Sequence, residues 1–173
     1  DVIIALAGLY PNDVLNQCVE FTGPGVGSLT MDARMSIANM TTEWGALVGW
    51  FPCDGVTLRW IRARMARGVK RASESDLARW EREPPLPDPD AAYAARIRLD
   101  LGQVTPHIAG PDSVQVATPL AEIEAKRIPI QRAYLVSCVN SRLEDLEAAA
   151  QVLAGKKVAP GVQLYVAAAS REV

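Results

Sequence analysis

Four polar side chains recur along residues 30–47, a segment in which most other residues are apolar or small. They are Asp32, Ser36, Asn39 and Glu43, spaced three or four positions apart. In an α-helix this spacing places all four on one face. Such a stripe is either the solvent-facing side of an amphipathic helix or the wall of a cleft, and periodicity leaves both interpretations open. In a cleft, Glu43 is a candidate general acid or base and Asn39 a candidate donor to a substrate.

A cysteine occupies a second position suited to chemistry, between a predicted strand and a predicted helix. In open α/β sheets this position faces the ligand-binding crevice, and the free backbone amides of the following helix favour anions. Cys138 is therefore a candidate nucleophile or metal ligand, and a buried small apolar residue is the third interpretation. The sequence contains no CxxC pair, so this chain cannot by itself supply three clustered thiolates.

Two other features favour structural interpretations. The single histidine, His107, lies in a predicted loop, and no GxSxG elbow or glycine-rich phosphate loop accompanies it. The arginine-rich segment 59–71 has one interleaved aromatic residue, Trp60, and an acidic segment follows it. We interpret His107 as a loop residue and the basic segment as a solvated helix face.

Composition and charge exclude several classes of protein. The chain has 173 residues, with 18 basic and 20 acidic side chains and a formal net charge of −2. This balance removes the strong field expected of a nucleic-acid-binding protein, and a hydrophobic content of 49% argues against disorder. No apolar run reaches the roughly 18–20 residues that a membrane-spanning helix needs. Three widely spaced cysteines indicate a reducing compartment rather than a disulfide scaffold.

Charge and proline content divide the chain into three parts. Residues 1–71 are densely apolar and end in a basic stretch, residues 72–90 are acidic and proline-rich, and residues 91–173 alternate strand-like with helix-like segments. We expect 72–90 to be a linker or surface loop between parts of two domains, because proline removes backbone donors and disfavours helix before it. Asp1 opens directly onto an apolar run, without an initiator Met or targeting segment, so we expect a piece of a longer protein.

Periodicity and end signals predict the elements. In the first part we expect helices over 2–9, 30–47 and 56–69 and short strands over 19–22 and 48–51. In the last part we expect strands over 93–101, 131–136 and 162–168, the last of them buried, and a helix over 141–153. Strand–helix–strand order implies a parallel βαβ unit, so the expected fold class is α/β.

Several segments together resemble the aconitase superfamily. Residues 23–46 (GPGVGSLTMDARMSIANMTTEWGA) resemble its GPGV…S…NM..E.GA region. Residues 106–111 (PHIAGP) resemble its PHINGP loop, residues 137–146 (SCVNSRLEDL) its SCTN.R.EDL segment, and residues 157–162 (KVAPGV) its continuation. The order is that of the family. Within the superfamily the sequence is most similar to fungal homoaconitases, with citrate aconitase and isopropylmalate isomerase as competitors.

The resemblance implies a three-layer α/β/α fold with a mostly parallel sheet, and a hydro-lyase that holds a [4Fe-4S] cluster. For homoaconitases the reaction is the reversible hydration of homoaconitate to homoisocitrate, in mitochondrial lysine biosynthesis. Cys138 matches the first of three cluster cysteines and Asn39 an asparagine that hydrogen-bonds substrate near the cluster. Glu43 matches a glutamate that helps transfer a proton. Val139 departs from the threonine that the family has after the cysteine.

The resemblance also implies what this chain lacks. The other two cluster cysteines form a CxxC pair farther along the family's chain. The catalytic serine and the substrate arginines of the family's last domain are also absent from this chain. Cys18 and Cys53 match no ligand motif. We therefore expect a central piece of the enzyme, with Cys138 as its one cluster ligand, no cluster held by the piece alone, and no turnover.

The expected partner is a small tricarboxylate. We do not expect a membrane or a nucleic acid as the main partner, and the sequence leaves the oligomeric state open. An alternative of another class is an RNA-binding module that uses the basic helix 59–71.

Overall fold

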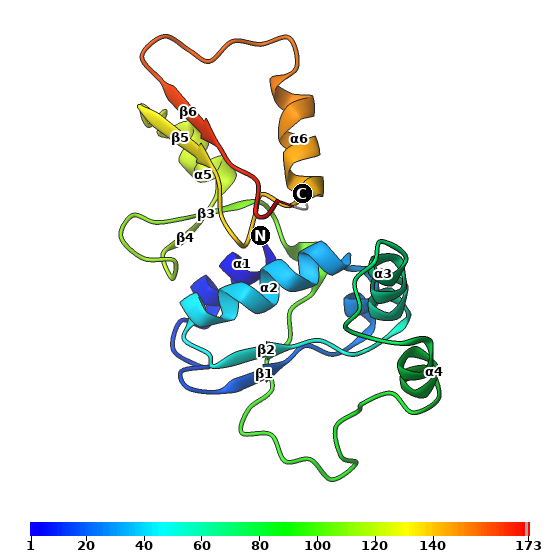
Figure 1. Cartoon of the computed structure of the whole chain (residues 1–173). Coiled ribbons are helices and arrows are strands. Elements are labelled where there is room, and N and C mark those ends of the chain that lie inside the picture. The colour runs from blue at the N-terminus through cyan, green and yellow to red at the C-terminus, as the bar shows by residue number, and fades with distance from the viewer. Residues whose placement is uncertain (172) are drawn as a thin grey trace.

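The first half of the chain combines four helices with a pair of short parallel strands (Figure 1). The computed structural model describes residues 1–171 and 173. The helices are α1 (Val2–Leu9), α2 (Met31–Trp44), α3 (Gly55–Ala66) and α4 (Glu74–Arg82), with the 3-10 helix η1 (Pro24–Ser28) before α2. Strands β1 (Cys18–Glu20) and β2 (Val48–Trp50) pair in parallel and lie below α2 in the figure.

In the second half, the elements from β3 onwards form the upper part of Figure 1. Its elements are η2 (Leu101–Gln103), β3 (His107–Ala109), β4 (Ala117–Pro119), α5 (Leu120–Ala125), β5 (Arg132–Leu135), α6 (Leu143–Leu153) and β6 (Gln163–Val166). β5 and β6 pair in parallel, and β3 and β4 in antiparallel fashion. Two of the three strand pairs in the described part of the chain are thus parallel, which confirms the α/β class with mostly parallel pairing.

Helix α2 has the ends that its sequence predicts. The Thr30 hydroxyl accepts a hydrogen bond from the Ala33 amide at 3.1 Å and so caps the first turn. Asp32 lies in that turn, where the helix dipole favours a negative charge. Gly45 ends the helix in the left-handed conformation with φ of +102°, which glycine adopts without a steric penalty.

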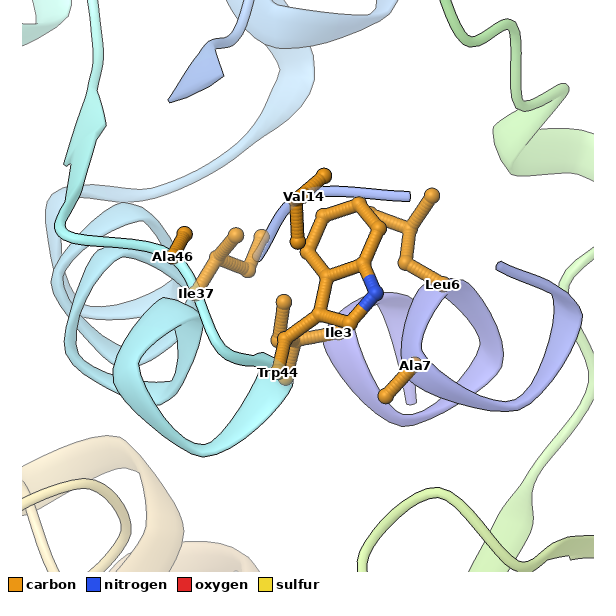
Figure 2. Packing of buried hydrophobic residues seen from close by; sticks show 7 residues of the cluster. All are labelled: Ile3, Leu6, Ala7, Val14, Ile37, Trp44 and Ala46. Carbon is orange, nitrogen blue, oxygen red and sulfur yellow. The ribbon is translucent and has the colours of Figure 1, made fainter. Parts of the chain in front are cut away.

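One face of α2 packs into the apolar core of the first half (Figure 2). The buried residues of this core are Ile3, Leu6, Ala7, Val14, Ile37, Trp44 and Ala46. Trp44 is 2% exposed, and its indole Nε1 donates a hydrogen bond to the Tyr10 carbonyl at 2.7 Å. The core therefore fixes both the position and the rotation of α2, and the opposite face of the helix turns towards the second half of the chain.

The expectation of a loop over 72–90 is wrong for its first half, where α4 forms. A reciprocal cap starts this helix: the Ser73 hydroxyl accepts from the Asp76 amide, and the Asp76 carboxylate accepts from the Ser73 amide at 3.0 Å. The prolines begin only after α4 ends. The division into parts of two domains stays a prediction.

Three further expectations differ from the structure. The segment 93–101 pairs with no strand among the described residues; Ile97 and Leu99 alternate inward because they pack on the core of the first half. His107 lies in β3, paired opposite Pro119, rather than in a loop. β6 is largely exposed rather than buried. Alternation reports which side of a segment is covered, whereas a strand also needs a backbone partner.

Among residues 1–171 and 173, no helix combines the length and apolarity that crossing a membrane would require.

Candidate functional site

The polar stripe of α2 faces the loop that joins β5 to α6, although about a hundred residues of chain separate them. The Ser36 hydroxyl donates a hydrogen bond to the Val139 carbonyl at 2.7 Å. One turn later, the Asn39 side-chain amide donates to the Cys138 sulfur at 3.8 Å. This part of the stripe therefore borders another segment of the protein, and it brings two of the predicted site residues together.

The two segments run in opposite directions along a line of polar contacts, which we call the α2 seam. The seam consists of Thr30 Oγ1 with Glu144 Oε1 at 3.0 Å, Asp32 with Arg142 at 3.7 Å, Ser36 with Val139, and Asn39 with Cys138. Residue numbers rise along the helix while they fall along the loop. A seam of this kind fixes the loop in both rotation and translation against the helix.

The loop that carries Cys138 has an unusual backbone. Ser137 and Ser141 flank it with φ of +147° and +108°, a region that side-chain-bearing residues adopt at a cost of about 1–3 kcal/mol each. Nearby groups hold this shape: the Ser137 hydroxyl accepts from the Val139 amide at 3.0 Å. The Asp145 carboxylate accepts from the amides of Ser141 and Arg142 at 3.1 Å each. Hydrogen bonds from neighbouring groups, rather than the intrinsic φ preference of serine, thus hold the backbone conformation of this loop.

A cavity of about 560 Å³ opens beside Cys138. Its lining is rich in positive charge and consists of Asn39, Arg64, Cys138, Arg142, Ala169, Ser170, Arg171 and Val173. The thiol of Cys138 is exposed. Of its three guanidinium groups, that of Arg142 already faces Asp32 at 3.7 Å. Guanidinium groups beside an exposed thiol suit a carboxylate ligand, because arginine binds carboxylates in a fixed two-pronged geometry.

Glu43 takes a different position from the other two predicted site residues. It is exposed on α2, one turn beyond Asn39 on the same face, and it does not line the cavity. The structure therefore brings Asn39 and Cys138 together and leaves Glu43 adjacent to them. No group of three or more His, Cys, Asp or Glu side chains suited to a metal ion occurs in the part of the chain that the structure describes.

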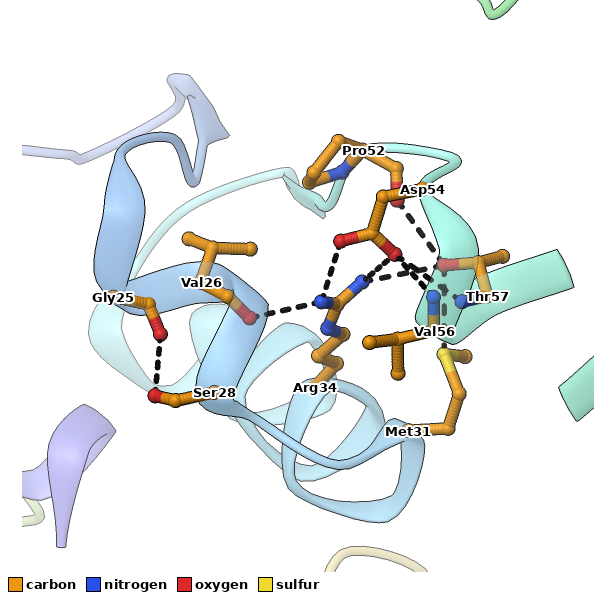
Figure 3. Close-up of polar contacts among 9 residues, drawn as sticks. All are labelled: Gly25, Val26, Ser28, Met31, Arg34, Pro52, Asp54, Val56 and Thr57. Atoms are coloured by element: carbon orange, nitrogen blue, oxygen red, sulfur yellow. Dashed lines mark hydrogen bonds and ion pairs between the residues drawn. The ribbon is translucent and has the colours of Figure 1, made fainter. Parts of the chain in front are cut away.

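An ion pair that the sequence did not reveal fixes α2 on the face away from Asn39 (Figure 3). Arg34 is 1% exposed and binds the Asp54 carboxylate through Nη1 at 2.8 Å and Nη2 at 2.7 Å. Nη2 also donates to the Val26 carbonyl at 2.8 Å. The hydrogen bond from Arg34 lowers the pKa of Asp54 from 3.8 to about 2.

This pair ties α2 to η1 and to the first turn of α3, because Asp54 also caps α3 through the amides of Val56 and Thr57. One signal could have found it. Arg34 lies on the buried face of α2, three residues before Ile37, and a charge on such a face needs a partner.

Apart from one arginine, the basic helix α3 lies outside the cavity lining, and so do the other two cysteines. On α3, Arg62 forms ion pairs with Glu81 at 3.0 Å and Glu74 at 3.9 Å of α4. These contacts offset part of the positive charge that an RNA-binding surface would use, and no observation favours that alternative. Cys18 is exposed, and burial raises the pKa of the half-buried Cys53 thiol.

Comparisons with known proteins identify the family. The model of the aconitase family (aconitate hydratase) matches residues 1–173. Similar proteins include "Homoaconitase, mitochondrial" of Eremothecium gossypii, 51% identical over 100% of this chain and 27% of the relative. The protein of the same name from Mycosarcoma maydis is 48% identical over 100% of this chain and 26% of the relative. The one from Yarrowia lipolytica is 49% identical over 98% and 25%.

The chain thus spans about a quarter of the length of these relatives. The match extends from its first residue to its last and includes both sides of the α2 seam. The chain belongs to the aconitase family.

Proposed function

We propose that this chain is part of a homoaconitase-type hydro-lyase, in which it supplies one cluster ligand and part of the substrate site. The reaction would be the reversible hydration of homoaconitate to homoisocitrate, in mitochondrial lysine biosynthesis. The relatives' name supports this proposal. The single structural observation behind it is the approach of Asn39 to the Cys138 sulfur at 3.8 Å beside a cavity lined by arginines.

The residues present fit one corner of a [4Fe-4S] cluster. Cys138 offers an exposed sulfur, and the Asn39 amide donates a hydrogen bond towards it. With no further cluster-ligating group among the described residues, the other ligands would come from elsewhere in the longer protein. We therefore infer that the chain alone holds no cluster and does not catalyse the reaction.

When bound, the cluster supplies a Lewis acid that polarises a substrate hydroxyl or carboxylate oxygen. Asn39 would then orient the substrate by donating a hydrogen bond from a rigid helix, since α2 is fixed by the core on its other side. Glu43, one turn away and exposed, would hold or deliver the proton that a dehydration and its reverse require. The arginines of the cavity would bind and align carboxylates of the substrate.

The test is a substrate comparison in the full-length enzyme that contains this chain, reconstituted with iron and sulfide under anaerobic conditions. Hydration of homoaconitate, cis-aconitate and the alkene of the isopropylmalate reaction is followed by the loss of each alkene's ultraviolet absorbance. We expect the largest kcat/KM for homoaconitate and none above background for the 173-residue chain alone. A larger kcat/KM for either competitor, or turnover by the chain alone, would contradict the proposal.

A further inference from the structure

We propose that Ser36 is a positioning residue for Cys138, because its hydroxyl holds the backbone of the loop that carries the thiol. The hydroxyl donates to the Val139 carbonyl at 2.7 Å, across a separation of 103 residues. Val139 follows Cys138 directly, and it is 7% exposed. The bond therefore acts at the Val139–Asn140 peptide, one residue beyond the thiol, and beside a buried side chain.

The loop needs an anchor on α2 because its contacts outside the seam are local or go to the segment after β6, where the Ala169 amide donates to the Ser141 carbonyl at 2.9 Å. The Ser137 hydroxyl and the Asp145 carboxylate stabilise its turn geometry, but both belong to the same stretch of chain. They cannot determine where the loop lies against α2. Of the contacts across the seam, the one from Asn39 to sulfur is long at 3.8 Å, and the Asp32–Arg142 ion pair spans 3.7 Å. The Ser36 bond, at 2.7 Å, is the shortest of the four seam contacts, and it is the one that holds the loop backbone.

Ser36 can position the loop because it is itself held rigidly. Its neighbour Ile37 is 5% exposed in the core, and Arg34 fixes the same turn through Asp54. Ser36 and Asn39 are one turn apart on one helix face, so the distance between hydroxyl and amide is set by helix geometry. Holding the Val139 carbonyl on Ser36 therefore sets the distance from the Cys138 sulfur to Asn39.

This inference deepens the proposed function, in which Cys138 ligates a cluster, but its test does not depend on that role. Hydrogen–deuterium exchange of the full-length enzyme, followed by mass spectrometry, reports how often the loop over 137–142 opens. The measurement needs no bound metal. In Ser36→Ala we expect these amides to exchange roughly five- to tenfold faster, the effect of one lost hydrogen bond. The amides of α1 should keep their wild-type rates.

Two variants separate positioning from general destabilisation. Ser36→Thr keeps a hydroxyl, and we expect it to restore wild-type exchange in the loop. Ser28→Ala removes a matched bond, from a serine hydroxyl to the Gly25 carbonyl at 2.7 Å, outside the seam. We expect that variant to leave the loop unchanged.

Wild-type exchange over 137–142 in Ser36→Ala would overturn the positioning role, and so would equal acceleration in α1 or failure of Ser36→Thr to rescue. A different result bears on the proposed function: full iron retention in the full-length enzyme after Cys138→Ser would remove the ligand role without touching the exchange data. The two failures are therefore distinguishable.

Discussion

Arg34 and Asp54 form a two-pronged ion pair in which the guanidinium is 1% exposed and the carboxylate 32% exposed. The pair connects the buried face of α2 with the first turn of α3 (Figure 3). Because α2 carries Asn39 on its opposite face, the pair stabilises the platform on which the candidate site is built. The Asp54 carboxylate also makes a pH-dependent contribution to the stability of the fold.

The first prediction concerns Asp54→Asn. In the wild type the folded-state pKa of Asp54 is about 2, below the ordinary 3.8. The contribution of this carboxylate to the free energy of unfolding is therefore complete above about pH 4 and is lost as the pH falls towards 2. Asparagine keeps a cap on α3 but removes the charge beside Arg34. We expect the variant to lose about 2 kcal/mol at pH 7, a value reduced for the partial exposure of the carboxylate.

Urea unfolding between pH 7 and pH 3 measures this. The difference between wild type and Asp54→Asn should shrink as the pH falls below 4, whereas Asp90→Asn, in an exposed turn, should match the wild type throughout. A variant as stable as wild type at pH 7 would show that the pair contributes nothing net.

The second prediction concerns the approach of β2 to α2. A methyl group on Gly49 would lie 2.9 Å from Thr41 Cγ2, 3.0 Å from Ala38 Cα and 3.2 Å from Phe21 Cε2. Because one of these atoms belongs to the helix backbone, we expect Gly49→Ala to lower the free energy of unfolding by about 2 kcal/mol. Gly27→Ala is the matched control, since a methyl there meets nothing within 4 Å. Equal urea midpoints for the two variants would refute the close approach.

The third prediction tests the backbone of the cysteine loop. Ser141 is fully buried with φ of +108°, and its hydroxyl has no hydrogen-bond partner among residues 1–171 and 173. Ser141→Gly removes both the strained conformation and the unpaired hydroxyl, and we expect a gain of about 1 kcal/mol. Ser137→Gly relieves a similar φ but loses the bond from the Val139 amide, so its net effect should be smaller. Thermal unfolding compares them, and destabilisation by Ser141→Gly would contradict this account.

Local signals explain which elements could be predicted. Thr30, Asp32 and Gly45 mark the ends of α2 within a few residues of the helix, so its bounds follow from the sequence. Helix α4 also has a local signal, the Ser73–Asp76 cap, but the prolines that follow dominate the composition of 72–90. A composition average over a segment conceals a helix that occupies half of it.

The candidate site needed more than local pattern. The spacing of the polar residues on α2 predicts a shared face but not what that face meets, and only the family resemblance related Asn39 to Cys138. The partner of Ser36 is the Val139 carbonyl, and a backbone group has no sequence signature. Likewise, the sequence contains many charges, and nothing in it pairs Arg34 with Asp54 in particular.

The fourth prediction concerns Glu43 in the full-length enzyme. If Glu43 transfers a proton, Glu43→Gln should lower kcat for homoaconitate roughly 10²–10⁴-fold, because the amide cannot exchange a proton at neutral pH. KM and iron content should change little, since the side chain is exposed and outside the cavity lining. Glu122→Gln, at an exposed glutamate on α5, is the control and should retain wild-type kcat. A kcat within twofold of wild type for Glu43→Gln would remove it from the proton-transfer step.

The most direct test of the central claim is iron per chain in the full-length enzyme after anaerobic reconstitution, compared for Cys138→Ser and Cys18→Ser. Both cysteines are exposed, so the two variants remove equally accessible thiols. The account predicts that Cys138→Ser loses the stable cluster and homoaconitate hydration together, while Cys18→Ser keeps both. A wild-type iron content and turnover in Cys138→Ser would show that the thiol beside Asn39 is not a cluster ligand.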